Sequence, residues 1–302
     1  MSLQFLVDGM LAGLLIGLGA IGVTLTYAIL RFANFAHGEL MTFGAYAAWA
    51  VSFGLAALVG STVPPLGPFS FTWTVLAGGA VAMLLSALLA LLLDALLFKR
   101  LREKSAPIVV VMASFGASMA LRSLIEFSFS SRPAYFSREL QIAQRFGLGI
   151  RVTPDQFALV GITALLLVCV HLFITRSQAG RTLRAVSENP SLARVVGIDV
   201  SGAVRLTWVL GGALAAAAGT MSGILVQIRP YMGFDLLLPL FSAAILGGIG
   251  SVPGAIAGGL IIGIAEAATV QFIGAEWRAA VAFILLIAML ILRPRGLFGA
   301  RA

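Results

Sequence analysis

Hydrophobic positions along the chain form long uninterrupted runs, which charged residues separate. A helix needs about 20 apolar residues to cross the hydrocarbon core of a bilayer. Residues 9–30, 156–175 and 206–228 each carry no charge and fit one crossing. Residues 40–93 are also uncharged but too long for one crossing, and the glycines and prolines between positions 60 and 68 predict a turn between two spans.

Polar residues interrupt the remaining runs. Residues 106–128 predict another span that contains Arg122 and Glu126, which lie four apart on one helical face and are expected to neutralise each other. Residues 236–265 are uncharged, but glycine, serine and proline residues between 247 and 254 leave 236–246 short for a full crossing. A last apolar run covers about 277–292.

Positive charge predicts the orientation, because Lys and Arg near span ends collect on the cytoplasmic side. The main basic clusters lie at 99–104, 176–205 and 293–301. If residues 236–250 cross, an even number of spans separates these clusters, so all three can lie inside. The pattern then predicts an all-α polytopic membrane protein of about nine transmembrane helices, with its N-terminus outside and its C-terminus cytoplasmic. Of the 20 Lys and Arg residues, 13 lie inside and six outside, with Arg122 within a span.

Composition supports a membrane protein and removes other classes. The chain is 60% hydrophobic and 11% charged, whereas soluble domains are about 25% charged. The net charge of +8 therefore reflects membrane sidedness, and we expect no nucleic-acid partner. The single cysteine, Cys169, lies in an apolar run, which indicates core packing without a disulfide or metal ligands. Since the first cationic side chain is Arg31, we expect no cleaved signal peptide.

Motifs for catalysis are missing from the sequence. Neither lysine belongs to a phosphate-binding G-x-x-x-x-G-K-[ST] loop, and H-E-x-x-H and G-x-S-x-G are absent. The G-x-G-x-x-G match at 17–22 lies inside a hydrophobic run, where helix packing explains it. We therefore expect a transporter or channel with no cofactor and no enzymatic activity. An ion-driven secondary transporter is the rival class, although it would be expected to present more intramembrane acidic residues than Glu39, Asp94, Glu126 and Glu266.

A first polar segment lies at the inner end of the first span. It contains Asn34, His37, Gly38 and Glu39, whose hydrogen-bonding groups are costly to bury. The segment either marks the turn between two spans or forms an inner gate on a translocation path.

A second segment, residues 180–201, contains a short helix by local rules. Asn189 suits an N-cap, Pro190 the first helical position and Gly197 the residue beyond the end, which predicts a helix over 190–196. Leu192, Val195 and Val196 share one face of it. The helix either lies at the membrane interface or inserts into a groove of a cytoplasmic partner, and we favour the partner.

Three further features leave alternatives open. Gly247, Gly248, Gly250 and Ser251 either line a substrate path in a broken span or form a tight inner turn. The outer loop 129–153 carries Arg132, Arg138, Arg145 and Arg151, and is either a harmless exception to the charge rule or a contact surface for an acidic partner. Glu266 either lines the path, lies near the outer interface or makes a structural hydrogen bond.

Four ordered motifs carry a resemblance that extends along almost the whole chain. The chain resembles the LivH-type permease subunits of branched-chain amino acid ABC importers. The matching residues are Asn34-Phe35-Ala36-His37-Gly38-Glu39; Gly180-Arg181, Arg184-Ala185, Glu188-Asn189-Pro190 and Ala193 to Gly197-Ile198; Ala243 to Ala255; and Arg293-Pro294-Arg295-Gly296.

The resemblance implies one permease domain over 1–302 with the ABC importer permease fold, in a bacterial inner (plasma) membrane. It also implies the partners: a second permease that is often a non-identical homologue, two cytoplasmic ATPases that carry ATP and Mg²⁺, and an extracytoplasmic binding protein. The segment 176–205 would dock on the ATPase through Gly180, Arg181, Arg184, Ala185, Glu188, Asn189, Pro190, Leu192, Ala193 and Gly197. Leucine, isoleucine and valine are the expected cargo, and urea or short-chain amides are the alternative within the family.

Overall fold

A computed structural model describes residues 3–60, 63–137, 141–145 and 149–299, so Arg138 and Arg301 lie outside the described residues. The secondary-structure elements of the described chain are all helices apart from one small antiparallel strand pair. Its elements are α1 (Gln4–Leu30), α2 (His37–Val59), α3 (Trp73–Leu93), the π-helix η1 (Asp94–Phe98), α4 (Lys99–Lys104), α5 (Pro107–Phe129), β1 (Gln144–Arg145), β2 (Arg151–Val152), α6 (Pro154–Arg176), α7 (Gln178–Glu188), α8 (Pro190–Val195), α9 (Val200–Leu225), α10 (Met232–Gly247), α11 (Val252–Phe272), the 3-10 helix η3 (Ala275–Trp277) and α12 (Arg278–Leu292).

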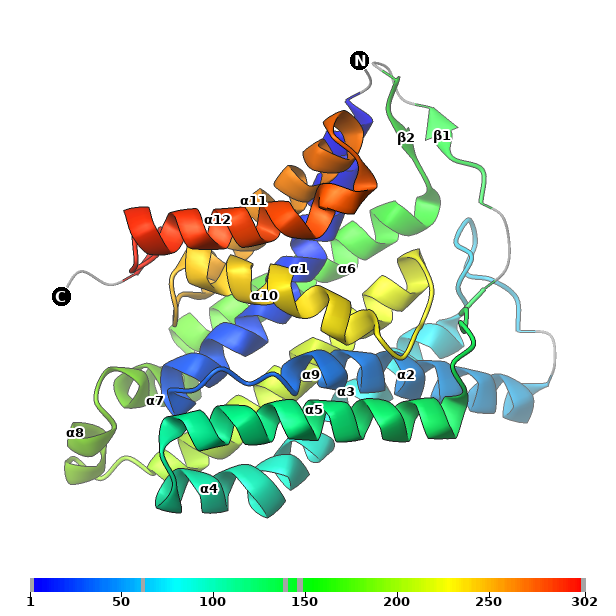
Figure 1. Ribbon diagram of the computed structural model, residues 1–302. Helices are drawn as coiled ribbons and strands as arrows, with labels where there is room; N and C mark the ends of the chain where they lie inside the picture. Colours follow the sequence, from blue (N-terminus) through cyan, green and yellow to red (C-terminus); the bar gives the residue numbers. More distant parts are fainter. Residues whose placement is uncertain (1–2, 61–62, 138–140, 146–148, 300–302) are drawn as a thin grey trace.

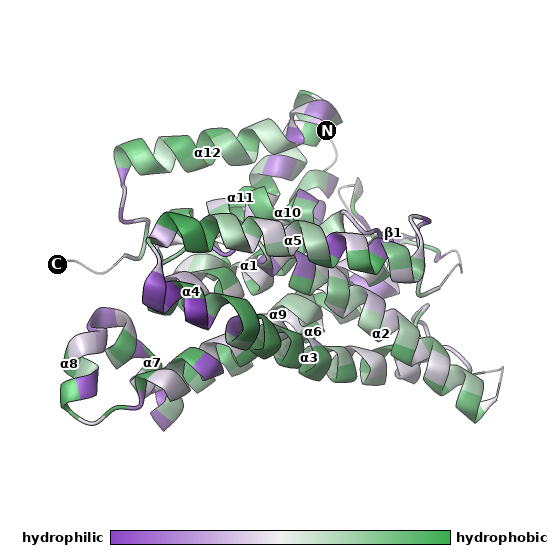
Figure 2. Ribbon diagram, turned by 60° about the horizontal axis from the view of Figure 1, so that its bottom comes forward, coloured by the Kyte–Doolittle hydropathy of each residue, from purple (hydrophilic) through white to green (hydrophobic). Residues whose placement is uncertain are grey.

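Eight helical segments in the described chain are long and apolar enough to cross a membrane. Each predicted full-length run corresponds to one of them, and α10 is a shorter apolar helix of 16 residues. The expected count of about nine therefore becomes eight full-length spans and one short helix. Figure 2 shows that hydrophilic residues gather on α4, α7 and α8, whereas α3, α5 and α12 are mostly hydrophobic.

Helix α1 runs through the middle of the bundle and packs closely against α11 (Figure 1). Gly9, Gly13 and Gly17 of α1 and Gly259 and Gly263 of α11, which are spaced four apart on their helices, make this approach possible. A Cβ atom at Gly13 would lie 2.7 Å from Leu260 Cα, and one at Gly263 would lie 2.3 Å from Gly13 N. The glycines of the G-x-G-x-x-G match lie within α1, so they serve helix packing.

The chain between α1 and α2 folds back into the bundle. Arg31 ends α1 in the left-handed region with φ 59°, and non-helical residues 32–36 follow. At the start of α2, His37 Nε2 lies 3.1 Å from the carbonyl oxygen of Gly19, which is 11 residues before the end of α1. At 1.5 Å per residue, α2 begins about 16 Å back from that end. The polar segment thus lies at the level of the middle of α1, deeper than the expected junction at a span end.

Helix α10 also begins inside the bundle, beside the start of α2. The amide of Gly233, in its first turn, donates to Thr42 Oγ1 at 3.0 Å, and Leu240 packs against Gly19. Residues 226–231 connect α9 to this point, and Ile228 forms an antiparallel bridge with Ala134. Two helices of different parts of the chain therefore begin at a common depth.

The basic helices and the C-terminal segment lie at one end of the molecule. Helices α4, α7 and α8 and the C-terminus share that end, while β1 and β2 lie at the opposite end beside the N-terminus (Figure 1). There, Gln4 of α1 bonds both the amide and the carbonyl of Arg151. This arrangement agrees with the expectation that the three basic clusters share one side.

Candidate functional site

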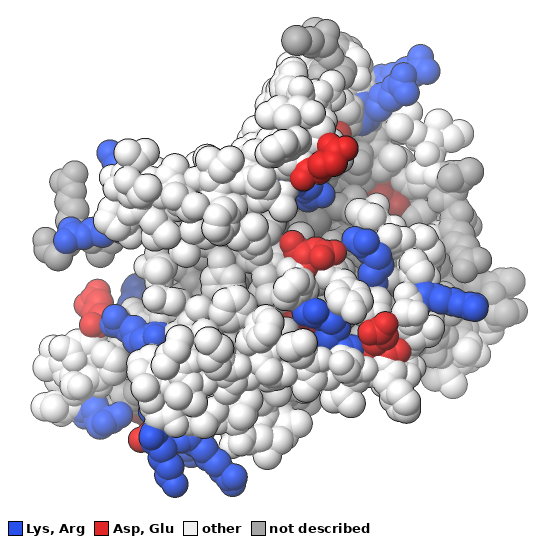
Figure 3. Space-filling model, viewed as in Figure 1, with Lys and Arg blue, Asp and Glu red and all other residues white. Residues whose placement is uncertain are grey.

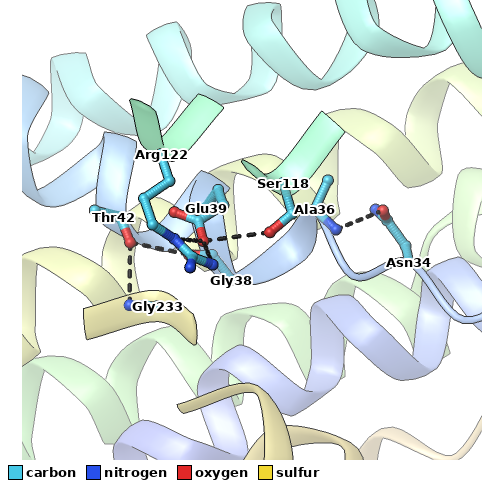
Figure 4. A network of polar contacts seen from close by, with 8 residues as sticks. All are labelled: Asn34, Ala36, Gly38, Glu39, Thr42, Ser118, Arg122 and Gly233. Carbon is cyan, nitrogen blue, oxygen red and sulfur yellow. Dashed lines mark hydrogen bonds and ion pairs between the residues drawn. The ribbon is translucent and has the colours of Figure 1, made fainter. Parts of the chain in front are cut away.

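A buried ion pair connects α2 to α5. Glu39 is fully buried, and Arg122 donates to its Oε1 from Nε at 3.1 Å and from Nη2 at 2.7 Å. Ser118 Oγ donates to the same oxygen at 3.3 Å, as Figure 4 shows. Arg122 therefore pairs with Glu39, and the expected pairing with Glu126 is wrong. The reason is that a buried carboxylate without its cation costs several kcal/mol, which outweighs the spacing of four on one helix.

Aromatic rings cover the guanidinium of Arg122. Its carbon Cζ lies 4.3 Å from the ring centre of Phe234 and 5.0 Å from that of Tyr231. Such stacking stabilises a cation by about 2 kcal/mol when water is excluded. Both rings come from the connection to α10 or from its first turn. The ion pair therefore joins the starts of α2 and α10 to the middle of α5.

The starts of α2 and α10 touch through backbone. A Cβ atom at Gly233 would lie 1.8 Å from the carbonyl oxygen of Gly38, so only glycine fits there. Thr42 Oγ1 accepts from the Gly233 amide and donates to the Gly38 carbonyl at 3.3 Å (Figure 4). Because the unpaired N–H groups of a helix start favour anions or acceptors, two such starts make this junction electropositive.

Asn34 and His37 position the segment that leads to the junction. Asn34 Oδ1 accepts from the amide of Ala36 at 3.1 Å, while its Nδ2 is buried without a hydrogen-bond partner. His37 is fully buried and bonds the Gly19 carbonyl of α1. Of the four predicted gate residues in this segment, Gly38 and Glu39 thus form the α2–α10 junction, and Asn34 and His37 fix the chain beside it.

A charged cleft of about 580 Å³ opens between α10, α11 and α12. Figure 3 shows acidic and basic side chains interspersed over a hollow between α12 and α5, and Phe234 contributes to the lining. The charged lining residues are Arg229, Asp235, Glu266, Glu276 and Arg278. One face of Phe234 therefore borders the cleft, and its ring covers the buried pair.

The glycine-rich segment forms a tight turn between α10 and α11. Gly248 and Gly250 have φ values of 102° and 87°, and Ser251 Oγ accepts from the Gly254 amide as the N-cap of α11. The C-terminal segment pairs with this turn, since the amides of Leu297 and Phe298 donate to the carbonyls of Leu246 and Gly247. Of the two interpretations of Gly247, Gly248, Gly250 and Ser251, the geometry favours the turn.

The predicted coupling segment forms two helices beside the C-terminal end of α6. Asn189 Oδ1 accepts from the Leu192 amide at 2.9 Å, and Gly197 has φ 85°, so both predicted end signals are confirmed. Helix α8 ends at Val195, one residue earlier than expected. Ala193 is buried, while Leu192, Val195 and Val196 are 58%, 83% and 66% exposed.

The sequence pattern does not predict helix α7. Its start packs closely on α6. A Cβ atom at Gly180 would lie 2.1 Å from the Ile174 carbonyl oxygen, to which Arg184 Nη1 donates at 2.6 Å. Arg31 Nη2 donates to the Ser187 carbonyl and ties α7 to the end of α1. The remaining predicted residues, Arg181, Ala185, Glu188 and Pro190, lie on α7 or begin α8.

Beyond α8, the Ser201 hydroxyl donates to Asp199 and holds the pKa of that exposed carboxyl below its ordinary value.

Two functional features were not found from sequence. Arg122 was assigned a local partner because its true partner is 83 positions away in the chain. The sequence assigns no role to Arg278, yet its Nε donates to the buried Glu266 at 2.8 Å. An apolar run that begins with one arginine gives no signal for such a contact.

Comparisons with known proteins agree with this architecture. Residues 5–290 match the family described as "Branched-chain amino acid transport system / permease component". The chain is 32% identical to the high-affinity branched-chain amino acid transport system permease protein LivH of Escherichia coli, over 98% of this chain and 95% of that protein. It is 33% identical to the corresponding permease protein BraD of Pseudomonas aeruginosa, with the same coverage. The chain therefore belongs to the family of branched-chain amino acid transport permeases, as a multi-pass membrane protein and a non-enzymatic subunit.

Proposed function

We propose that this chain carries leucine, isoleucine or valine across a bacterial inner membrane by ATP-driven alternating access. Its partners would be a second permease subunit, two cytoplasmic ATPases that bind ATP and Mg²⁺, and an extracytoplasmic binding protein. The observation that carries the proposal is the junction where α2 and α10 both begin inside the bundle. Non-helical backbone is tolerated at membrane depth only against protein or a water-filled path, and helices interrupted at mid-depth are typical of substrate sites in transporters.

The charged cleft would be the outward opening of the path. It reaches the start of α10 through Phe234, behind which lies the Arg122–Glu39 pair. Movement of α10 against α2 would then expose or cover the junction. Gly38 and Gly233 suit such movement, because their close contact leaves no side chain between the helices.

The exposed apolar face of α8 would receive the force from an ATPase. Three hydrophobic side chains that point away from the chain's own core suit insertion into a groove of another protein. Helix α7 adjoins α8, and its Arg31–Ser187 and Arg184–Ile174 contacts lead to α1 and α6. A push on α8 would therefore reach α1, which packs on both α10 and α11.

Purification from native membranes in mild detergent tests the complex, and uptake tests the cargo. We expect a P-loop ATPase in near equal amount, with a second permease, and ATP-dependent leucine uptake by vesicles that contain the purified complex. Uptake of urea in place of leucine would change the cargo and keep the mechanism. Solute uptake without ATP by a chain that purifies alone would replace the proposal with an ion-driven transporter.

A further inference from the structure

A second cavity adjoins the charged cleft, and two charged residues line it where five line the cleft. It measures about 250 Å³, and it shares Ser222, Val226, Leu236 and Arg278 with the cleft. Most of its lining is apolar and includes Leu11, Leu15, Ile16, Met41, Leu236 and Leu240, while its polar lining residues are Asp8, Gln156, Ser222 and Arg278. At roughly 30 Å³ per water, it would hold about eight waters, so a branched aliphatic side chain fits. We call it the apolar chamber.

The deep end of the apolar chamber meets the junction of α2 and α10. Met41 lies two residues after Glu39 on α2, and Leu240 packs against Gly19 at the level where α2 begins. A ligand in the chamber would therefore lie next to the junction of α2 and α10, where the path must open.

Glu266 and Arg278 stand where the two cavities meet. Glu266 is 1% exposed and lines the cleft, and Arg278 lines both cavities. Arg278 Nε donates to Glu266 Oε2 at 2.8 Å, whereas Glu266 Oε1 is buried with no hydrogen-bond partner. A buried carboxylate oxygen without a donor is costly, so a cation or donor from a ligand would stabilise it. Half of the Arg278 side chain is exposed, which leaves it accessible to an anionic ligand group.

From this arrangement we infer that the chamber and the Glu266–Arg278 pair bind a zwitterionic α-amino acid with an apolar side chain. The ammonium group bonds Glu266 Oε1, the carboxylate bonds the guanidinium of Arg278, and the aliphatic side chain fills the apolar chamber. Each charge of the ligand then meets an opposite charge of the site. A neutral solute such as urea carries no charge that could make either contact. The inference rests on the proposed function and adds the site at which this subunit itself recognises the cargo.

Ligands that lack one charge separate the two contacts. The full-length chain in lipid nanodiscs is titrated with L-leucine, with leucinamide, which lacks the carboxylate, and with isocaproate, which lacks the ammonium group. We expect Glu266→Gln to weaken binding of leucine and leucinamide by about tenfold or more and to leave isocaproate unchanged or tighter. Arg278→Gln should weaken leucine and isocaproate and spare leucinamide. Glu103→Gln, at an exposed residue of α4 that lines neither cavity, is the matched control and should change none of the three.

The side-chain contact has its own variant. Ala12 lines the chamber, so Ala12→Phe should reduce its volume and lower affinity for leucine more than for alanine. If the Glu266–Arg278 pair is purely structural, both substitutions lower the unfolding temperature of the ligand-free protein and weaken the binding of all three ligands alike. That pattern would overturn the inference.

The two proposals fail in different ways. If the wild-type chain binds none of the three ligands while the complete transporter takes up leucine, the site is wrong and the proposed function stands. If the chain binds none of them and the transporter takes up urea but no leucine, the site and the proposed cargo are both wrong.

Discussion

At the scale of single residues, the buried Glu39–Arg122 pair is the contact of the site whose loss should destabilise the fold most. Glu39 has no exposed surface, Arg122 is its cation, and Glu39 Oε2 is buried without a hydrogen-bond partner. Removing one member of a buried pair costs far more than the intact pair contributes, because the remaining charge is left without compensation. The pair therefore holds α2 in place against α5, and the rings of Tyr231 and Phe234 pack on its surface.

Replacement of Arg122 tests this account. Arg122→Met should lower the free energy of unfolding by about 3–5 kcal/mol, and the double variant with Glu39→Gln should recover much of the loss. Unfolding curves in detergent measure both effects. Arg229→Met is the control, since its pair with Asp235 is exposed and 3.7 Å long, and should change stability by about 1 kcal/mol at most. Equal losses for both arginines would contradict a special role for the buried pair.

Gly233 offers a second test at the same scale. Gly233→Ala would place a Cβ atom 1.8 Å from the Gly38 carbonyl oxygen, so the starts of α2 and α10 must move apart. Overpacking of this kind costs about 1–3 kcal/mol, and we also expect loss of uptake because the junction is displaced. Gly116→Ala on α5 meets open space and should preserve both stability and uptake. A Gly233→Ala variant that transports normally would show that the contact is dispensable.

At the scale of elements, α8 combines a buried anchor with an exposed apolar face. Leu192→Asp should abolish stimulation of the partner ATPase by substrate, because it places a charge in the proposed groove contact. Its unfolding temperature should remain near the wild-type value, since Leu192 is 58% exposed. Ala193→Leu, beside it but buried, should instead destabilise the α7–α8 segment. ATP hydrolysis and uptake are measured together in vesicles. Full coupling of the two in Leu192→Asp would show that α8 does not form the ATPase contact.

The elements also show which features can be predicted from local sequence. The spans follow from run length, and both ends of α8 follow from Asn189 and Gly197, because these signals lie within the element itself. The depth at which α2 begins does not follow, since hydropathy measures whether a helix is long enough and carries no information on where its neighbours place it. The Glu39–Arg122 pair shows the same limit, because tertiary packing selected a partner 83 positions away over one four positions away.

At the scale of the whole molecule, charge is distributed unequally between the two ends. Helices α4, α7 and α8 and the C-terminal segment gather the basic clusters at one end, opposite β1 and β2 (Figure 1). The ATPase contact proposed for α8 requires that this end be cytoplasmic, and the distribution of Lys and Arg favours the same side. Sidedness thus connects the proposed coupling to the proposed outward opening of the cleft.

Cysteine labelling tests the sidedness directly. The single cysteine, Cys169, is exposed on α6, so the expectation of core packing is wrong, and Cys169→Ser gives a background for new cysteines. Ser131→Cys, just beyond α5, and Ser201→Cys, in the first turn of α9, place exposed thiols near opposite ends. We expect a membrane-impermeant maleimide to label Ser131→Cys in intact spheroplasts and Ser201→Cys only after permeabilisation, because the basic end faces the cytoplasm. The reverse pattern would place α8 beyond the reach of any cytoplasmic ATPase, and with it the proposed coupling would fall.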